Sequence, residues 1–327
     1  MPFPGTITDV PGVKVGHFTD ADAGAGTTAI IFEQGARGGV DARGLASGSR
    51  ELPTLDGIHV TPVCHALCLS GGSAFGLAAA DGVMRSLADR GIGYFARVTV
   101  VPIVVGAIIF DLSFKKIAKP DAGFGFRAAE AATDGPVEMG SVGAGTGATV
   151  GKILGPEHAV KGGLGSASAR TADGVTVGAL AVVNNLGDVL DWRTGRILAG
   201  TRGPDGNFAD TAKLLATMTA FVPPIPPVAE ATNLVAVATD AGLDKNGAAK
   251  LARMASAGMA RALRPAFTAF DGDLCFAFST GDRRADVNVL GTIASELVAR
   301  AINRAVMAAD GLGALPTAAE LSPWWCD

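Results

Sequence analysis

The sequence predicts an α/β protein in which β-sheets and α-helices form separate layers. In the first 200 residues, runs rich in β-branched side chains alternate with Gly-rich turns. After a proline-rich passage the pattern changes to strand, helix, strand and helix. The last helix carries apolar residues at spacings of three and four, and this broad stripe has to be covered by another layer.

Several elements are expected in the first 200 residues. The predicted strands are residues 13–18, 27–32, 98–105 and 175–183. A helix is expected from Ser73, as its N-cap, to Gly91, because apolar residues recur between them at helical spacing.

The proline-rich passage separates these elements from the last part of the chain. Residues 221–228 contain four prolines, which remove backbone donors and fix φ, so an extended connector is predicted there. The elements expected after it are a strand at 234–238, a helix between Asp244 and Pro265, a strand at 274–278 and a helix that includes Leu290 and Val306.

Composition narrows the possible partners. The 327 residues include 27 Lys and Arg against 31 Asp and Glu, a net charge of −4, and only 18% are charged. Without a basic block the chain has no electrostatic footprint for a phosphate backbone, so no nucleic-acid partner is expected. The mean hydropathy is +0.35, but the longest apolar run, residues 98–110, is interrupted by Pro102. A bilayer needs about 20 apolar residues, so no membrane association is expected.

The sequence also indicates a cytoplasmic location. Residues 1–4 have neither the cationic segment nor the apolar core of a signal peptide. Four cysteines are too few for a disulfide scaffold at this length and fit a reducing compartment.

Three motifs of other functional classes do not match the sequence. Residues 143–152 lack the first glycine of a phosphate loop and the Ser or Thr after its lysine, so a tight Gly-rich turn is the better interpretation. Cys64, His65 and Cys68 have no second ligand pair, which favours buried small side chains over a metal site. No Gly-x-Ser-x-Gly elbow supports a Ser-His-Asp triad. No metal and no cofactor are therefore expected.

Five ordered segments together resemble one known family. They are residues 101–112 (VPIVVGAIIFDL), 140–152 (GSVGAGTGATVGK), 181–188 (AVVNNLGD), 238–240 (ATD) and 270–273 (FDGD). The sequence resembles the self-processing L-aminopeptidase/D-esterase family, which includes β-peptidyl aminopeptidases and nylon-oligomer hydrolases. The likeness extends from Ile7 to the final helix, nearly the whole chain.

The resemblance implies a four-layer αββα sandwich, a single domain over residues 1–327, and a tetramer. It also implies one self-cleavage, between Ala231 and Thr232, into chains 1–231 and 232–327, after which Thr232 is an N-terminal nucleophile. This chemistry suits the residue type, because a free α-amine with a pKa of about 7.7–8.0 can take the proton of its own hydroxyl.

The resemblance assigns further roles by position. Asn184 corresponds to an asparagine beside the reacting carbonyl, and Lys152 to a lysine near the nucleophile. Asp271 and Asp273 flank Gly272, and as alternate residues their side chains can point the same way. One of them would hold Thr232 and the other would support Lys152. Alone, this Asp-Gly-Asp segment would be read as a solvated turn.

The substrate implied is a small peptide with a removable N-terminal residue, or a short amide oligomer. Two alternatives stay open. The segment Ala231–Leu234 partly resembles that of the glutamate/ornithine N-acetyltransferases, which share the fold and a threonine nucleophile. If Thr232 and Asn233 align instead with the pair before the usual nucleophile, the chain is an unprocessed homologue that binds peptides. Phe110 stands where some of these hydrolases have a tyrosine.

Overall fold

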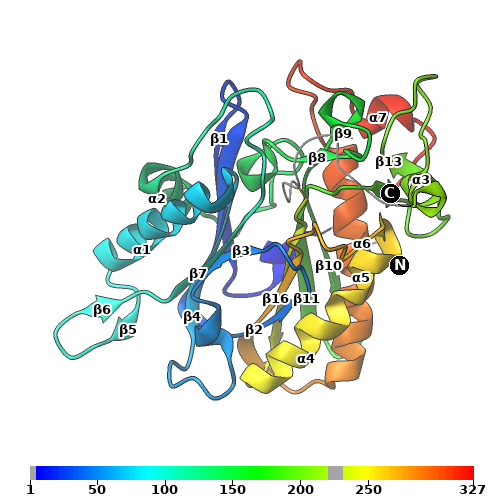
Figure 1. Ribbon diagram of the computed structural model, residues 1–327. Helices are drawn as coiled ribbons and strands as arrows, with labels where there is room; N and C mark the ends of the chain where they lie inside the picture. Colours follow the sequence, from blue (N-terminus) through cyan, green and yellow to red (C-terminus); the bar gives the residue numbers. More distant parts are fainter. Residues whose placement is uncertain (1–4, 220–230) are drawn as a thin grey trace.

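Two β-sheets packed face to face form the middle of the molecule, and helices cover the outer face of each sheet (Figure 1). The computed structural model describes residues 5–219 and 231–327. The layers follow the order helix, sheet, sheet, helix, which confirms the four-layer αββα sandwich. Within the described ranges, no helix is long and apolar enough to cross a membrane.

One long strand, β2 (Ala25–Ala42), belongs to both sheets. Its first half pairs with β1 (Lys14–Asp20) and β4 (Cys64–Ser70), and β4 is followed across the sheet by β7 (Val104–Ile108) and β3 (Gly48–Arg50). Its second half pairs with β16 (Leu274–Arg283) in the other sheet.

The order of strands in the second sheet positions the candidate site. Next to β16 lie β14 (Leu234–Ala241), β11 (Thr176–Val183) and β10 (Gly163–Arg170). β14 is parallel to β16 and antiparallel to β11, with Leu234 opposite both Leu274 and Val182. The start of β14 therefore lies between the start of β16 and the end of β11.

Helices α1 (Ala79–Asp89) and α2 (Ala122–Glu130) pack on the first sheet. Helices α4 (Lys245–Ala255) and α6 (Val287–Met307) pack on the second, and α5 (Ala257–Ala262) packs against α6. The remaining elements are α3 (Thr211–Thr217), α7 (Ala318–Leu321), the 3-10 helices Ile7–Asp9, Leu52–Leu55, Ser73–Ala78, Gly143–Gly145 and Pro156–His158, and the short strands β5 (Tyr94–Phe95), β6 (Val100–Val101), β8 (Thr149–Val150), β9 (Val160–Lys161), β12 (Asp188–Leu190), β13 (Ile197–Ala199) and β15 (Leu263–Arg264).

Three buried apolar cores separate the layers. The core between the sheets contains Phe32, Leu69, Leu180 and Phe276. A second lies between the second sheet and α4, α5 and α6, and a third between the first sheet and α1 and α2. Since both faces of the strands next to the site are covered, polar groups at their ends have to find partners within the protein.

Most predicted elements are present, with three corrections. The strand expected at 98–105 is broken at Pro102, because proline cannot donate to a ladder, and gives β6 and β7 instead. Ser73 does not cap a helix; it begins a 3-10 helix, and α1 begins only at Ala79 without a side-chain cap. The helix expected between Asp244 and Pro265 is divided at Ser256, whose hydroxyl donates to Asp41 and to the Arg253 carbonyl.

Two other expectations fall on undescribed residues. The connector at 221–228 and the residues 1–4 used to predict the location lie outside the described ranges.

The Gly-rich segment 143–152 is a tight turn region, as expected: a Cβ on Gly145 would lie 2.5 Å from the backbone nitrogen of Leu164. Cys64 and Cys68 are buried, as expected.

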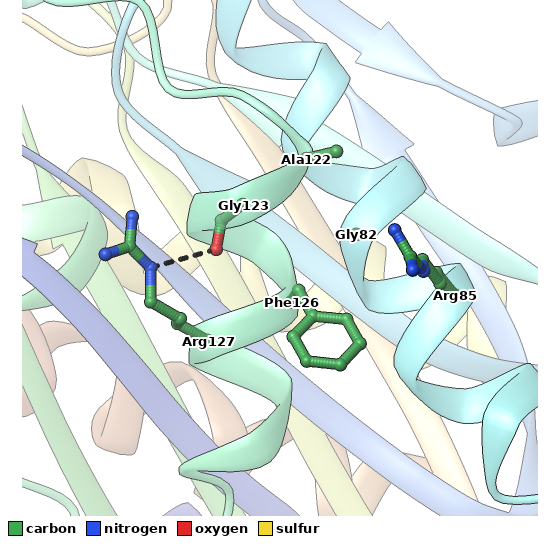
Figure 2. A pocket seen from close by; sticks show the side chains of 6 residues that line it. All are labelled: Gly82, Arg85, Ala122, Gly123, Phe126 and Arg127. Carbon is green, nitrogen blue, oxygen red and sulfur yellow. Dashed lines mark hydrogen bonds between the residues drawn. The ribbon is translucent and has the colours of Figure 1, made fainter.

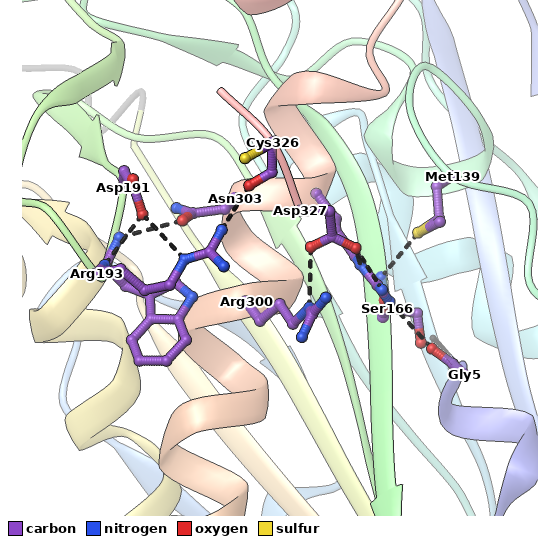
Figure 3. A network of polar contacts seen from close by, with 11 residues as sticks. Gly5, Met139, Ser166, Asp191, Arg193, Arg300, Asn303, Cys326 and Asp327 are labelled. Atoms are coloured by element: carbon purple, nitrogen blue, oxygen red, sulfur yellow. Dashed lines mark hydrogen bonds and ion pairs between the residues drawn. The ribbon is translucent and has the colours of Figure 1, made fainter. Parts of the chain in front are cut away.

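The chain near both of its described ends is anchored to α6 (Figure 3). The Asp327 carboxylate accepts hydrogen bonds from Arg300 and Arg304, each at 2.9 Å from the guanidinium Nε. Arg304 also donates to the Gly5 carbonyl at 3.1 Å and to that of Ser166 in β10 at 2.8 Å. Each arginine is largely buried, so these bonds compensate for the loss of water around the two charges.

Helices α1 and α2 approach closely through glycines. Figure 2 shows Gly82 of α1 facing α2 across the groove that also contains Arg85 and Phe126. A Cβ on Gly82 would lie 1.8 Å from the Ala122 carbonyl oxygen, and one on Gly125 would lie 1.7 Å from that of Ala79. Backbone, rather than a movable side chain, fills the space at both glycines.

The substitution Gly125→Ala tests this packing. We expect it to lower the free energy of unfolding by about 1–2 kcal/mol, because overpacking outweighs the gain in helix propensity. Urea denaturation measures the change. Gly135→Ala is the control, since its Cβ would meet only Thr133 Oγ1 at 3.5 Å. Equal midpoints for parent and Gly125→Ala would contradict the interpretation.

Candidate active site

Thr232 lies just before β14 and is held by backbone bonds on both sides. Its N–H donates to the Asn184 carbonyl at 2.8 Å, at the end of β11. On the other side, Ala231 forms an isolated parallel bridge with Asp271, just before β16. Only 2% of Thr232 is exposed. The peptide between Ala231 and Thr232 is therefore fixed in a buried position.

The Ala231 carbonyl oxygen accepts two hydrogen bonds. Thr232 Oγ1 donates at 2.7 Å and the Gly272 N–H donates at 2.9 Å. A Cβ on Gly272 would lie 2.5 Å from Thr232 Oγ1 and 2.9 Å from the Ala46 carbonyl oxygen. The absence of a side chain at Gly272 thus leaves room for the threonine hydroxyl beside this carbonyl.

Asn184 connects Thr232 to Lys152. While its backbone carbonyl accepts the Thr232 N–H, its side-chain Oδ1 accepts Lys152 Nζ at 2.8 Å and the Thr149 N–H at 3.0 Å. Its Nδ2 donates to the Phe110 backbone carbonyl at 3.0 Å. The amide that the resemblance assigns to a reacting carbonyl thus donates to the backbone of Phe110 in this structure.

Asp271 and Asp273 are fully buried, so the solvated-turn interpretation is wrong. Asp273 Oδ1 accepts both the N–H and Nδ2 of Asn233, at 2.7 and 3.0 Å. Asp271 Oδ2 accepts the Thr268 N–H at 2.6 Å, whereas Oδ1 is buried and has no hydrogen-bond partner among the described residues. One carboxylate is therefore satisfied, and the other has one unused acceptor.

Burial governs the ionisation of both acids. Desolvation raises the pKa of Asp271, and the nearby Lys152 ammonium acts against this rise. Desolvation, and then the charge of Asp271, raise the pKa of Asp273 to about 7. The pair thus retains a proton at pH values where ordinary carboxyl groups have lost theirs.

Two asparagines complete the network without having been assigned a role from the sequence. Asn233 Oδ1 accepts the Asn184 N–H at 3.2 Å, and its Nδ2 donates to Asn185 Oδ1 at 3.1 Å as well as to Asp273. Asn233 therefore joins the end of β11 to the start of β16. The position of Asn233 next to Thr232 is the signal by which the sequence could have identified it, but its hydrogen-bond partners depend on the order of the strands.

All five predicted site residues thus converge on the start of β14. Lys152 bonds to Asn184, Asn184 bonds to Thr232, and the Asp271–Asp273 segment pairs with the peptide before Thr232. Their catalytic roles remain predictions. No group of three or more His, Cys, Asp or Glu suited to a metal occurs among residues 5–219 and 231–327.

Comparisons with known proteins found relatives that extend over nearly the whole chain. The chain is 39% identical to an uncharacterized aminopeptidase of Mycobacterium leprae, over 97% of this chain and 94% of that protein. It is 32% identical to a 6-aminohexanoate-oligomer endohydrolase of Agromyces, over 89% and 82%. The L-aminopeptidase D-Ala-esterase/amidase of Ochrobactrum anthropi, described as a variant of the Ntn hydrolase fold, matches with a TM-score of 0.69, 22% identity and coverage of 95% and 89%.

The family match and the relatives define a hydrolase of amide bonds. The chain belongs to peptidase family S58, whose pattern matches residues 5–316. The family resemblance seen in the sequence is therefore confirmed.

The raised pKa of Asp273 predicts how stability depends on pH. A carboxyl group that binds its proton more tightly when folded stabilises the fold below its unfolded pKa, about 3.9, and this contribution is lost as the pH rises towards 7. In Asp273→Asn, which retains an acceptor for Asn233, the fall between pH 4.5 and 8 should be shallower by a few kcal/mol at most. Urea midpoints measured across this range test the difference, and parallel curves would contradict it.

Proposed function

We propose that this protein is a self-processing amide hydrolase that cleaves its Ala231–Thr232 bond and then uses Thr232 as an N-terminal nucleophile. The observation that carries the proposal is the buried Thr232 hydroxyl beside the Ala231 carbonyl, whose oxygen also accepts the Gly272 N–H. Catalysis requires the nucleophile and a donor to the developing oxyanion to be held before the reaction starts.

The self-cleavage follows from these contacts. Thr232 Oγ1 attacks the Ala231 carbonyl carbon and loses its proton, and negative charge develops on the oxygen that faces the Gly272 N–H. The carbon–nitrogen bond then breaks, the nitrogen gains a proton, and the Ala231 acyl group is left as an ester on Oγ1. Water hydrolyses the ester, which releases the Ala231 carboxylate and restores the Thr232 hydroxyl. A single oxyanion donor contributes about 3 kcal/mol in known cases.

After cleavage, Thr232 has its own base. The α-amine takes the hydroxyl proton as Oγ1 attacks the substrate carbonyl, and it returns the proton to the leaving amine. Water then releases the acyl group in the same manner. Asp271 offers a buried Oδ1 with no partner among the described residues, which is suited to hold the α-ammonium. Lys152 places a positive charge on the same network through Asn184.

The names of the relatives guide the choice of substrate. We propose that the mature chains, 1–231 and 232–327, remove small N-terminal residues from peptides or cleave short amide oligomers, in a cytoplasmic tetramer. Relatives named aminopeptidase and 6-aminohexanoate-oligomer endohydrolase support amide hydrolysis. Membership of a peptidase family favours hydrolysis over acetyl exchange.

Intact mass spectrometry tests the cleavage. The purified parent should give two masses that add up to the full chain plus one water, with the new N-terminus at Thr232. Thr232→Val keeps the β-branched shape without the hydroxyl and should remain whole and inactive, whereas Thr232→Ser should still process. A parent that stays whole, folded and unable to hydrolyse peptides would instead support an unprocessed binding homologue.

Gly272→Ala probes the space beside the nucleophile. Its Cβ would displace Thr232 Oγ1, and we expect processing to slow by about 100-fold, as for other small misplacements of reacting groups. The rate of fragment formation is the measurement, with Gly135→Ala as the control. Processing at the parental rate in Gly272→Ala would argue against this position for the hydroxyl.

A further inference from the structure

Lys161 is a fully buried cation outside the set of residues assigned to the reaction. It is the last residue of β9, none of it is exposed, and its Nζ donates to three backbone carbonyls. These belong to Gly145 at 3.0 Å, Ala148 at 2.8 Å and Gly162 at 2.8 Å. Every proton of the ammonium thus has a backbone acceptor, which is the condition for burying such a charge.

One of these carbonyls belongs to a peptide that also touches the site. The Ala148 carbonyl and the Thr149 N–H are the two ends of one peptide unit, and the Thr149 N–H donates to Asn184 Oδ1 at 3.0 Å. In a trans peptide the two groups point in opposite directions. Lys161 therefore holds one edge of this peptide while Asn184 is bound to the other.

The same Asn184 oxygen also accepts Lys152 Nζ, so the orientation of the Ala148–Thr149 peptide influences where both side chains lie. A positive charge on its carbonyl polarises the peptide and strengthens the hydrogen bond that its N–H donates. The Ala148 carbonyl also accepts the Gly162 N–H at 2.9 Å, so Lys161 is one of two donors that hold this edge of the peptide, and the one that carries a charge.

Asp111 lies near the same cation. Its charge raises the pKa of Lys161, whereas burial lowers that pKa more strongly, to about 7. Asp111 directly follows Phe110, whose carbonyl accepts Asn184 Nδ2 at 3.0 Å. The Thr149 N–H and the Phe110 carbonyl bind the two ends of the Asn184 side-chain amide. Phe110 adjoins Asp111, and Lys161 binds the Ala148–Thr149 peptide, so each of these two segments lies next to a buried ionisable group.

We propose that Lys161 is a positioning residue for the active site: it orients the Ala148–Thr149 peptide, and through it the Asn184 amide and Lys152. This inference rests on the proposed function, because its effect is read from self-cleavage and hydrolysis. A lysine that merely stabilised the fold would change the unfolding transition without a matching effect on the reaction.

Lys245 provides a control with the same number of backbone acceptors, at a partly exposed position. Its Nζ also donates to three backbone carbonyls, those of Thr54, Asp56 and His59. Thr232 precedes the first residue of β14, whereas Lys245 follows the last one. The eight residues of β14 between them span about 26 Å. Lys245→Met therefore removes the same kind of contact at a distance from the site.

The test compares Lys161→Met with Lys245→Met by intact mass spectrometry, under conditions in which both are folded. We expect Lys161→Met to slow self-cleavage by about 100-fold and Lys245→Met to cleave at the parental rate. In matured protein, Lys161→Met should lower kcat while KM changes little. Lys161→Gln, which keeps N–H donors without the charge, is measured in its place if Lys161→Met does not fold.

Chemical rescue separates positioning from a general loss of stability. In Lys161→Ala, added ammonium or methylammonium should restore part of the cleavage rate, whereas tetramethylammonium, which has no N–H, should not. The proposal fails if folded Lys161 variants process at the parental rate, or if both lysine variants slow the reaction equally. A parent that neither processes nor hydrolyses would instead overturn the proposed function itself.

Discussion

The buried Ala231–Thr232 peptide is held by main-chain hydrogen bonds from both neighbouring strands, and the arrangement of the site depends on this pairing. The Thr232 N–H is bound to the residue that follows β11, while the Ala231 carbonyl is bound to Gly272 just before β16. Both bonds require β14 to lie between an antiparallel and a parallel neighbour, with Leu234 in register with Leu274 and Val182. A shift of register by one residue would turn the Thr232 side chain to the other face of the sheet and remove it from Gly272.

Placing this peptide at a buried end of the second sheet has an electrostatic cost that the surrounding side chains offset. Lys152, Asp271 and Asp273 are all largely or fully buried, and isolated charges in such a place would be strongly unfavourable. Two asparagines supply compensating hydrogen bonds: Asn184 accepts one from Lys152, and Asn233 donates to Asp273. An amide side chain donates hydrogen bonds through its nitrogen and accepts them through its oxygen, so it can link a hydrogen-bond donor to an acceptor. Asp271 Oδ1 is left buried without a hydrogen-bond partner among the described residues.

The sequence predicted the site residues better than their bonds. Five site residues could be found from the sequence because each lies within or beside a short motif that is contiguous in the chain. They are Lys152, Asn184, Thr232, Asp271 and Asp273. Lys161 and Asn233 could not be given roles, since their meaning depends on which strands become neighbours. Among the elements, β11 and α6 carry strong apolar patterns and were predicted, whereas β10 is rich in Gly, Ala and Ser, and α2 has only nine residues, two of them glycine. Ser256, where α4 and α5 meet, donates a hydrogen bond to Asp41, more than two hundred residues away, and no local signal reveals this contact.

The same contacts suit Thr232 before and after the proposed cleavage, which explains why a precursor can fold with its site already assembled. In the precursor, the Thr232 nitrogen is an amide that donates one hydrogen bond to the Asn184 carbonyl. As an ammonium it would have three donors, so the Asn184 carbonyl could keep its bond while further acceptors are needed. A buried carboxylate oxygen without a partner among the described residues is costly in the precursor and becomes favourable once a cation faces it. Under the proposed cleavage, a new ammonium that reached this oxygen would supply the missing partner, and this gain would favour the cut chain over the intact one.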